Sequence, residues 1–352
     1  MSAEIPAGAM RFNSDSQKLE YWNGSAWFQV HTATPDLASA GDPTPGARGL
    51  FAGGYQPGAY QNDIDYINIA STGNTQDFGT LNNVVTAGGG VGSRTRALFA
   101  GGYGPGTPGA IAQIDTVVFA SKGNASDYGD LNNSTNTRRG GAGNATRGLF
   151  AGGGAPGATQ IDYVTIATTG TANDYGDLTV GRSRFAGAGS PVRGVFAGGF
   201  TGPSPNVYRE TIDFVTTPTI GNAQDFGDLT NGKSWTAVCS NPTRLLIGGG
   251  AISPDGNTAV SEMEYITIST TGSATIFGDL NQVVDTGHYA GSGLASSTRG
   301  VFNTGIFKNP STTYDNTLYY VEISTTGKAT DFGDLDGKRY GVQTASNAHG
   351  GL

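Results

Sequence analysis

The stretch Arg193-Gly194-Val195-Phe196-Ala197-Gly198-Gly199 is one of six related phrases in this 352-residue chain. Successive copies start 46 to 55 residues apart, and the other five begin at Arg48, Arg96, Arg147, Arg244 and Arg299. A repeat of about fifty residues is typical of the blades of a β-propeller. The repeat therefore predicts the fold far better than it predicts the function.

Each phrase belongs to a longer unit with four strand-like segments. In the fourth unit a run of small residues at 181–189 precedes the phrase. The two segments that follow it contain Ile212-Asp213-Phe214-Val215 and Asp225-Phe226-Gly227-Asp228-Leu229, and related sequences recur in the other units. Short runs of β-branched and aromatic residues bounded by glycine-containing turns predict strands. Four strands per unit predict the four-stranded blade of a propeller.

Composition excludes several classes of partner. The chain has 58 glycines, but they recur at fixed places in the repeat, so they indicate turns and close strand packing rather than low complexity. Its formal charge is −8 and it has no run of Lys or Arg, which argues against binding nucleic acid or anionic membranes. No apolar stretch approaches the roughly 20 residues that span a bilayer, and no signal-peptide pattern is present. We therefore expect no membrane insertion.

The order of the strands resembles the kelch repeat over residues 48–352, with a Gly-Gly doublet ending the second strand and an aromatic residue in the fourth. The chain departs from that repeat where Ile-Asp-aromatic and Asp-aromatic-Gly-Asp-Leu replace its Tyr and Trp, and where Thr304-Gly305 replaces the doublet. The first unit opens at its second strand, while residues 337–347 follow the last unit and read like a first strand. We expect an all-β fold: a six-bladed kelch-like β-propeller closed by its C-terminal strand.

Residues 1–30 lack the repeat and predict a small β module. Asn23-Gly24 separates two aromatic-rich runs, which is a strong signal for a hairpin, and a preceding run at 10–12 predicts a third strand. Residues 8–27 resemble a short module found near the ends of many bacteriophage tail-fibre and virion structural proteins. Residues 31–47 read as a linker. The resemblance implies attachment through the aromatic residues Phe12, Tyr21, Trp22, Trp27 and Phe28.

The sequence contains no catalytic or metal-binding constellation that we can identify. His31, His288 and His349 lie in different regions, and neither they nor the single Cys239 form a zinc-type pattern. Galactose oxidase has a kelch-type propeller, but nothing here matches its Tyr-Cys cross-link or its copper ligands. We also find no nucleophile elbow and no phosphate-binding loop. The expectation is a protein that is not an enzyme and that has no cofactor or metal.

The repeated charges suggest structural roles. Arg193 is expected at the same end of its sheet as Asp225, so we predict an arginine–carboxylate contact within or between blades. The acidic residues of the third strands lie next to the variable loops, where they either cap those loops or form a ring that binds cations; they are Asp65, Asp115, Asp162, Asp213 and Glu264.

Recognition is expected where the units differ. The loops between second and third strands vary in length and content while the strands hardly change, and variable loops on a constant scaffold are the usual place for binding. In kelch-type propellers these loops share a face with the connections between blades. Aromatic residues and arginines exposed together suit protein anchors or sugar stacking. The candidates are Tyr55, Tyr103, Arg139, Arg184, Phe200, Tyr208, Trp235, Tyr289, Arg339 and Tyr340.

These observations and the N-terminal resemblance suggest a bacteriophage virion structural protein, located in a tail fibre, elsewhere in the tail or on the particle surface. The expected partners are other virion proteins, bound through the N-terminal module, and a host-surface glycan or protein, with homo-oligomers as a further option. The alternative is a carbohydrate-binding lectin or a protein-interaction scaffold that is not tied to a virion.

Overall fold

The computed structural model describes residues 6, 8–13, 18–29, 47–106, 109–132, 138–154, 157–202, 207–252, 258–280, 287–289, 291–309 and 311–352. All the regular secondary structure assigned within those ranges is β-strand, so the all-β prediction is confirmed there. The chain divides into two compact units, Met1–Pro45 and Gly46–Leu352, and each is described by itself. The predicted linker at 31–47 lies outside the described residues except for Ala47.

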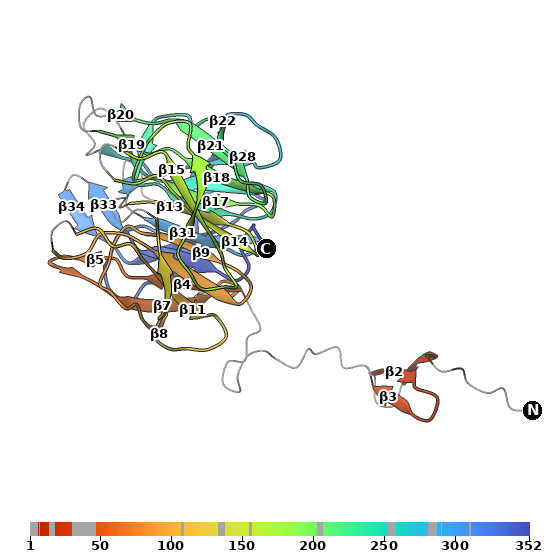
Figure 1. Cartoon of the computed structure of the whole chain (residues 1–352). Helices are drawn as coiled ribbons and strands as arrows, with labels where there is room; N and C mark the ends of the chain where they lie inside the picture. The colour runs from red at the N-terminus through yellow and green to blue at the C-terminus, as the bar shows by residue number, and fades with distance from the viewer. Residues whose placement is uncertain are drawn as a thin grey trace, which may run out of the picture. The chain divides into compact units, whose positions relative to one another are not determined.

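Six four-stranded antiparallel sheets account for most strands described in the larger unit (Figure 1). Sheet 1 has the order β37 (Gln343–Ser346), β4 (Arg48–Ala52), β7 (Asp63–Asn68) and β8 (Gln76–Thr80). Sheet 2 comprises β9 (Gly89–Gly92), β10 (Arg96–Ala100), β11 (Gln113–Val118) and β12 (Ser126–Asp130). Sheet 3 comprises β13 (Gly140–Gly143), β14 (Arg147–Ala151), β15 (Gln160–Thr165) and β16 (Asn173–Asp177).

The other three sheets repeat this order. Sheet 4 comprises β17 (Ala186–Gly189), β18 (Arg193–Ala197), β21 (Thr211–Thr216) and β22 (Gln224–Asp228). Sheet 5 comprises β24 (Ala237–Ser240), β25 (Arg244–Gly248), β28 (Glu262–Thr267) and β29 (Thr275–Asp279). Sheet 6 comprises β31 (Ser292–Ala295), β32 (Arg299–Asn303), β35 (Thr317–Glu322) and β36 (Thr330–Asp334).

Strand β18 shows why the recurring phrase forms a buried central strand. Phe196 pairs with Gly187 of β17 on one side and with Asp213 of β21 on the other. Val195 and Phe196 are both fully buried, and because successive side chains of a strand point to opposite faces, both faces of the sheet are covered. A Cβ on Gly187 would lie 2.7 Å from the Phe196 ring, so the small-residue run makes room for the aromatic residue.

The repeated arginine of each second strand links its sheet to the next one. Arg193 Nη1 donates to the carbonyl of Ile268 in sheet 5 at 2.7 Å, and its guanidinium lies 4.5 Å from the centroid of Phe214. The series returns to its start, since Arg299 of sheet 6 donates to the carbonyl of Ile69, which directly follows β7 in sheet 1. The predicted contact with Asp225 is wrong. Asp225 is exposed, and the acceptors shared by the repeated arginines are backbone carbonyls at the ends of strands, which need donors. In sheet 6 Arg299 Nε also donates to the Glu322 carboxylate at 3.0 Å, so an arginine–carboxylate contact within a sheet does occur there.

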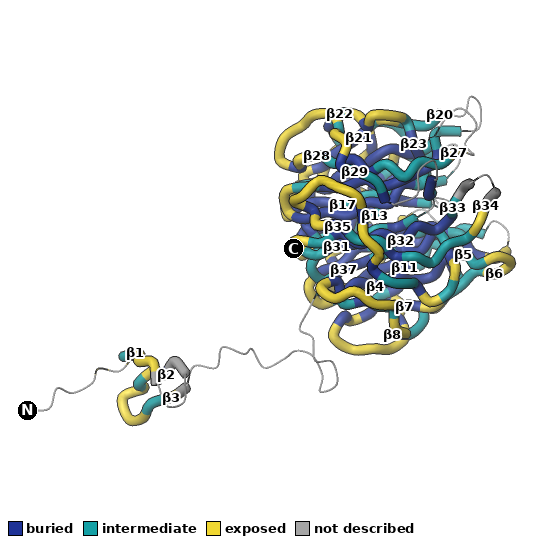
Figure 2. The backbone as a smooth tube through the Cα atoms, turned by 180° about the vertical axis from the view of Figure 1, so that it is seen from behind, coloured by how far each residue is buried: buried dark blue, intermediate teal, exposed yellow. Residues whose placement is uncertain are grey.

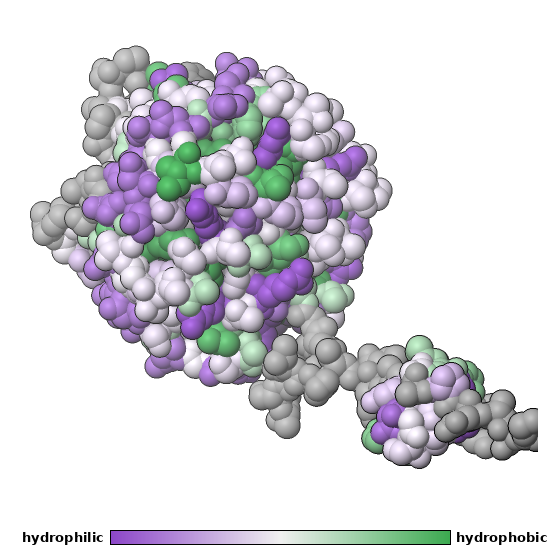
Figure 3. All heavy atoms as spheres, turned by 45° about the vertical axis from the view of Figure 1, so that its right-hand side comes forward, coloured by the Kyte–Doolittle hydropathy of each residue, from purple (hydrophilic) through white to green (hydrophobic). Residues whose placement is uncertain are grey.

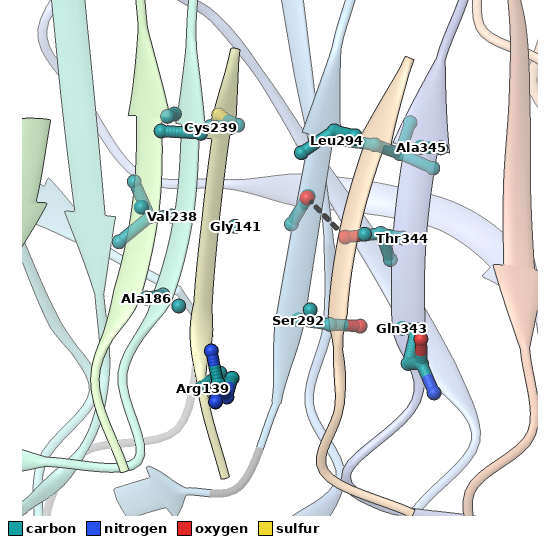
Figure 4. Close-up of a pocket in the computed structure, with 18 of the residues that line it drawn as sticks. Arg139, Gly141, Ala186, Val238, Cys239, Ser292, Leu294, Gln343, Thr344 and Ala345 are labelled. Carbon is teal, nitrogen blue, oxygen red and sulfur yellow. Dashed lines mark hydrogen bonds between the residues drawn. The ribbon is translucent and has the colours of Figure 1, made fainter. Parts of the chain in front are cut away.

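The first strands of the sheets contact one another in a cyclic order: β9, β13, β17, β24, β31, β37 and again β9. Glycine permits this approach, since a Cβ on Gly141 would lie 2.5 Å from the carbonyl oxygen of Gly90. Where a side chain replaces glycine it bonds to the neighbouring strand, as Thr344 Oγ1 does to the Gly293 carbonyl at 2.7 Å (Figure 4). These six strands enclose the cavity described below.

Four of the six variable segments contain hairpins on one side of the larger unit, and the C-terminus lies on the opposite side (Figures 1 and 2). The sequence predicted loops here. The hairpins are β5 (Tyr55–Gln56) with β6 (Ala59–Tyr60), β19 (Phe200–Thr201) with β20 (Val207–Tyr208), β26 (Ala251–Ile252) with β27 (Thr258–Ala259), and β33 (Ile306–Asn309) with β34 (Ser311–Tyr314). Two further strands, β23 (Lys233–Ser234) and β30 (Gly287–Tyr289), extend the last two hairpins into three-stranded sheets.

The N-terminal unit contains a three-stranded antiparallel sheet of β1 (Met10–Asn13), β2 (Lys18–Trp22) and β3 (Trp27–Gln29). Trp22 pairs with Trp27, so four residues rather than Asn-Gly alone make the turn. The Asn23 side-chain oxygen accepts hydrogen bonds from the backbone N–H groups of Ser25 and Ala26, both at 2.8 Å. Asparagine is thus used here as a side-chain cap of the turn.

Candidate functional site

A cavity of about 130 Å³ lies between the six inner strands (Figure 4). Its mouth on the hairpin side is bordered by residues that come just before those strands. Ala87, Arg138, Arg184 and Trp235 occupy equivalent places before β9, β13, β17 and β24, and all four have left-handed backbones with φ from 58° to 62°. This conformation costs a residue other than glycine about 1–2 kcal/mol. Strained backbones of this kind concentrate at binding and catalytic sites, which directs attention to this mouth.

Two arginines and a tryptophan meet at the mouth. The guanidinium carbons of Arg138 and Arg184 lie 5.9 and 5.4 Å from the Trp235 ring centroid. Backbone hydrogen bonds hold them in series, from Arg184 N–H to the Arg138 carbonyl at 3.1 Å and from Trp235 N–H to the Arg184 carbonyl at 2.6 Å. Three sheets therefore position the three side chains.

Within the part of the chain that the structure describes, the two guanidiniums have no carboxylate partner. Among the described residues, neither Arg138 nor Arg184 forms an ion pair, and the buried Nε of Arg184 has no hydrogen-bond acceptor. Burial lowers the pKa of Arg184, and the like charge of Arg138 lowers it further. The site thus concentrates positive charge on a chain with a net charge of −8.

Aromatic rings extend this cluster along the hairpin side. Tyr103 lies 5.6 Å from the Arg138 guanidinium and 5.9 Å from Tyr60. Tyr60 contacts Tyr55 at 5.1 Å, Tyr55 contacts Tyr340 at 5.5 Å, and Tyr340 stacks on Tyr314 at 5.7 Å. Burial, followed by the neighbouring tyrosines, raises the pKa of Tyr340 to about 12, so its hydroxyl stays protonated and able to donate.

On the other side of the mouth, the Arg184 guanidinium lies 4.8 Å from the Phe200 ring, which contacts Tyr208 at 5.4 Å. We call the whole set the aromatic–arginine band. All its members are half-buried, so each ring packs on a neighbour and keeps a surface toward solvent. They are Tyr55, Tyr60, Tyr103, Arg138, Arg184, Phe200, Tyr208, Trp235, Tyr314 and Tyr340.

The structure brings together seven of the ten predicted loop residues. Those in the band are Tyr55, Tyr103, Arg184, Phe200, Tyr208, Trp235 and Tyr340. Tyr289, an eighth, is half-buried at the end of β30, and burial, followed by Tyr314, raises the pKa of its hydroxyl.

Arg139 and Arg339 were predicted to be exposed, and this prediction is wrong. They are 3% and 1% accessible, and they form buried ion pairs with Asp162, at 2.6 Å, and with Asp65. A buried guanidinium needs a carboxylate to offset its desolvation, and the acidic residues of the third strands supply it.

The same pairing explains the other repeated acidic residues. Arg182 pairs with Asp213 at 2.8 Å, and Lys233 pairs with Glu264. Asp115 instead accepts hydrogen bonds from the Asn82 side chain at 2.6 Å and its backbone N–H at 2.9 Å, and burial raises its pKa. In the described part of the chain no three His, Cys, Asp or Glu side chains are placed to hold a metal ion. Four of the five acidic residues thus pair with cations of the chain itself.

Sequence reasoning missed Arg138, Tyr60 and Tyr314. The pair Arg138-Arg139 indicated an arginine at this position, but the sequence analysis chose Arg139, which is buried, instead of Arg138. It also missed three polar side chains that line the cavity and are at least nine-tenths buried. Thr236 Oγ1, Ser292 Oγ and Gln343 Oε1 make no hydrogen bond within the described structure.

The thiol and the imidazoles described in the larger unit, Cys239, His288 and His349, are buried or part-buried. Burial raises the pKa of the Cys239 thiol and lowers that of His288 to about 4, so both are neutral at pH 7. At the end of the cavity opposite the band, His349 Nε2 lies 2.7 Å from the Gly92 carbonyl oxygen, and His349 Nδ1 accepts from the Gly351 N–H at 3.0 Å. The C-terminal turn therefore contacts the inner strands at that end.

The predicted attachment residues divide between the two faces of the N-terminal sheet. Phe12, Tyr21 and Phe28 are exposed, at 66%, 40% and 46%, and share one face with Met10. Trp22 and Trp27 pack on the other face, 5.5 Å apart, with the Arg11 guanidinium 4.2 Å from the Trp27 ring. The exposed apolar face is therefore narrower than the sequence predicted.

Comparison with known proteins gives no family: no family model matches the chain, and no curated protein is significantly similar to it. No helix in the described ranges is long and apolar enough to cross a membrane. On the side of the larger unit shown in Figure 3, hydrophobic residues form small patches interrupted by hydrophilic ones.

Proposed function

We propose that the larger unit is a six-bladed kelch-like β-propeller in which each four-stranded sheet is one blade and the C-terminal strand closes the ring. The cyclic contacts of the inner strands support this proposal, as does the pairing of β37 with β4. The arginine of sheet 6 that bonds to sheet 1 supports it independently.

On this scaffold the chain acts as a virion structural protein of a bacteriophage, with a binding rather than a catalytic role. The N-terminal unit attaches it to other virion proteins, and the hairpin side binds a ligand on the host surface. The observation that carries the binding role is the aromatic–arginine band, because half-exposed aromatic rings beside unpaired guanidiniums are typical of recognition surfaces.

The virion location rests on the N-terminal sequence resemblance and on the exposed face of Met10, Phe12, Tyr21 and Phe28. A sheet of three short strands cannot cover such a face by itself, so the face needs another surface to be buried. A neighbouring virion protein is the partner proposed for it.

Deletion of residues 1–40 tests this role. We expect the shortened chain to be absent from assembled phage particles. Its larger unit, residues 46–352, should melt at the same temperature as it does in the full-length chain. As a finer comparison, Phe12→Ser with Phe28→Ser should prevent incorporation, whereas Ser25→Ala, in the turn of the same unit, should not. Incorporation of the deletion variant at the normal level would exclude attachment through this unit. Ligand binding without any incorporation would favour the free lectin or scaffold.

A further inference from the structure

We infer that the mouth formed by Arg138, Trp235 and Arg184 binds a carboxylate-bearing sugar, such as a uronic acid unit of an acidic surface polysaccharide. This inference rests on the proposed host-surface binding and specifies its ligand class. It places the carboxylate between the two guanidiniums and the sugar ring against the aromatic residues.

Charge is the first support. Most other arginines of the larger unit have acceptors: the repeated arginines bond to carbonyls, and Arg182 and Arg339 pair with carboxylates. Arg138 and Arg184 instead flank one indole ring and have no anionic partner among the described residues. A planar carboxylate fits a guanidinium with two parallel hydrogen bonds, and its charge would relieve the repulsion between the two cations.

The second support is the ring surface. Trp235 lies within 6 Å of both guanidiniums, and Tyr103 continues the surface beyond Arg138. Indole and phenol rings present flat apolar faces with polar edges, which suit the apolar face of a pyranose. An acidic peptide would satisfy the charges but would not need this continuous row of rings.

The cavity gives the third support. Thr236 Oγ1, Ser292 Oγ and Gln343 Oε1 line it, and none has a hydrogen-bond partner within the described structure. Figure 4 shows Ser292 and Gln343 on inner strands around the cavity. A cavity of about 130 Å³ has room for a polar substituent of a sugar. The rest of the saccharide would lie along the band.

The experiment uses the purified full-length chain and oligosaccharides of galacturonic, glucuronic and N-acetylneuraminic acid. Neutral galactose oligomers, inorganic phosphate and a polyglutamate peptide serve as competitors. Titration calorimetry measures affinity. In a chain with Trp22→Phe and Trp27→Phe, Trp235 is the one remaining tryptophan, and its fluorescence reports the location of the ligand. We expect at least one acidic oligosaccharide to bind and its affinity to fall as the salt concentration rises, and we expect the neutral galactose oligomers to bind about tenfold or more weakly than it does.

Glycine substitutions give matched variants. Arg138→Gly and Arg184→Gly remove a charge at positions whose left-handed backbone favours glycine, and Gly341 occupies the equivalent place in sheet 1 with φ 64°. Ala87→Gly makes the same backbone change without removing a charge, and Arg94→Gln removes a charge from an exposed residue between β9 and β10. Melting temperatures identify any variant that fails to fold.

Affinity should fall by about tenfold or more in each arginine-to-glycine variant, by much less in Ala87→Gly, and stay unchanged in Arg94→Gln. The inference is overturned if no acidic saccharide binds, if the neutral sugar binds equally well, or if phosphate or polyglutamate competes as strongly. Equal affinity in Arg184→Gly and Ala87→Gly would also overturn it. These binding measurements need no phage particle, so a negative result does not contradict attachment through the N-terminal unit. A negative incorporation experiment, in turn, does not affect the binding result.

Discussion

At the scale of single residues, the conspicuous charges divide into those that hold the sheets together and those that face solvent at the mouth. Asp213 belongs to the first class. It accepts hydrogen bonds from Arg182 Nη1 at 2.8 Å and from the Thr179 N–H and hydroxyl at 3.1 and 2.6 Å, and Thr179 follows the last strand of the preceding sheet. One carboxylate therefore neutralises a buried cation and ties two sheets.

Replacing Asp213 with Asn should lower the free energy of unfolding by about 3–5 kcal/mol, because it leaves the Arg182 guanidinium buried without a counter-charge. Urea denaturation measures the change. Glu322→Gln is the comparison, since Glu322 bonds to Arg299 at 3.0 Å with a side chain that is 48% exposed, and such pairs contribute about 1 kcal/mol or less. Equal losses in the two variants would contradict the structural role of the buried pair.

Arg138 and Arg139 show the limit of sequence reasoning at this scale. Adjacent residues at the start of a strand point in different directions, and the sequence does not show which one enters the interior. The answer depends on the left-handed backbone of Arg138, which is fixed by contacts with other sheets. The sequence therefore indicated that arginines gather at this end, but not which arginine is free to bind.

At the scale of elements, the fourth strand of each sheet carries a glycine that the neighbouring sheet requires. A Cβ on Gly79 would lie 2.3 Å from the carbonyl oxygen of Gly123, which precedes the fourth strand of sheet 2. The Gly123 N–H in turn donates to the Phe78 carbonyl at 2.8 Å. Close contact between backbones thus explains why Asp-aromatic-Gly recurs.

Gly79→Ala and Gly73→Ala separate this contact from backbone strain. Both glycines have φ of 154°, but a Cβ on Gly73 would meet nothing within 4 Å. Gly73→Ala should therefore lower the free energy of unfolding only through the strain of an alanine at this φ, by about 1–3 kcal/mol. Gly79→Ala should cost at least about 1 kcal/mol more because it also displaces the next sheet. Thermal unfolding of the two variants gives the difference, and equal melting temperatures would show that the sheets do not need this approach.

The strands of the six four-stranded sheets were predictable because their sequence pattern repeats. In each repeat, runs of β-branched and aromatic residues are bounded by turn residues. The hairpins were not, because β5 with β6 and β19 with β20 consist of two-residue strands without a repeated pattern. Their aromatic residues contact rings of neighbouring variable segments, as Tyr60 contacts Tyr103. The candidate site therefore depended on contacts that no local sequence pattern encodes.

At the scale of the molecule, sheet 1 draws its strands from both ends of the repeat region. Gln343 to Ser346 pair with Ala52 to Gly49, and Thr344 and Ser346 also bond to carbonyls of sheet 6 through their hydroxyls, both at 2.7 Å. The C-terminal strand therefore joins the first sheet to the last as well as completing the first.

Ending the chain after Asp336 removes β37, and we expect the melting temperature to fall by roughly 10 °C or more. Without that strand the backbone of β4 loses one row of hydrogen bonds, and the buried Leu50 and Phe51 lose cover. Ending the chain after Asn347 is the matched control. It keeps β37 and the bond from the Arg48 N–H to Asn347 Oδ1, and it removes only the turn with His349. Calorimetry should show a much smaller fall for this control. Similar melting temperatures for the chain ending at Asp336 and the full chain would mean that the sheets do not depend on closure by the C-terminal strand.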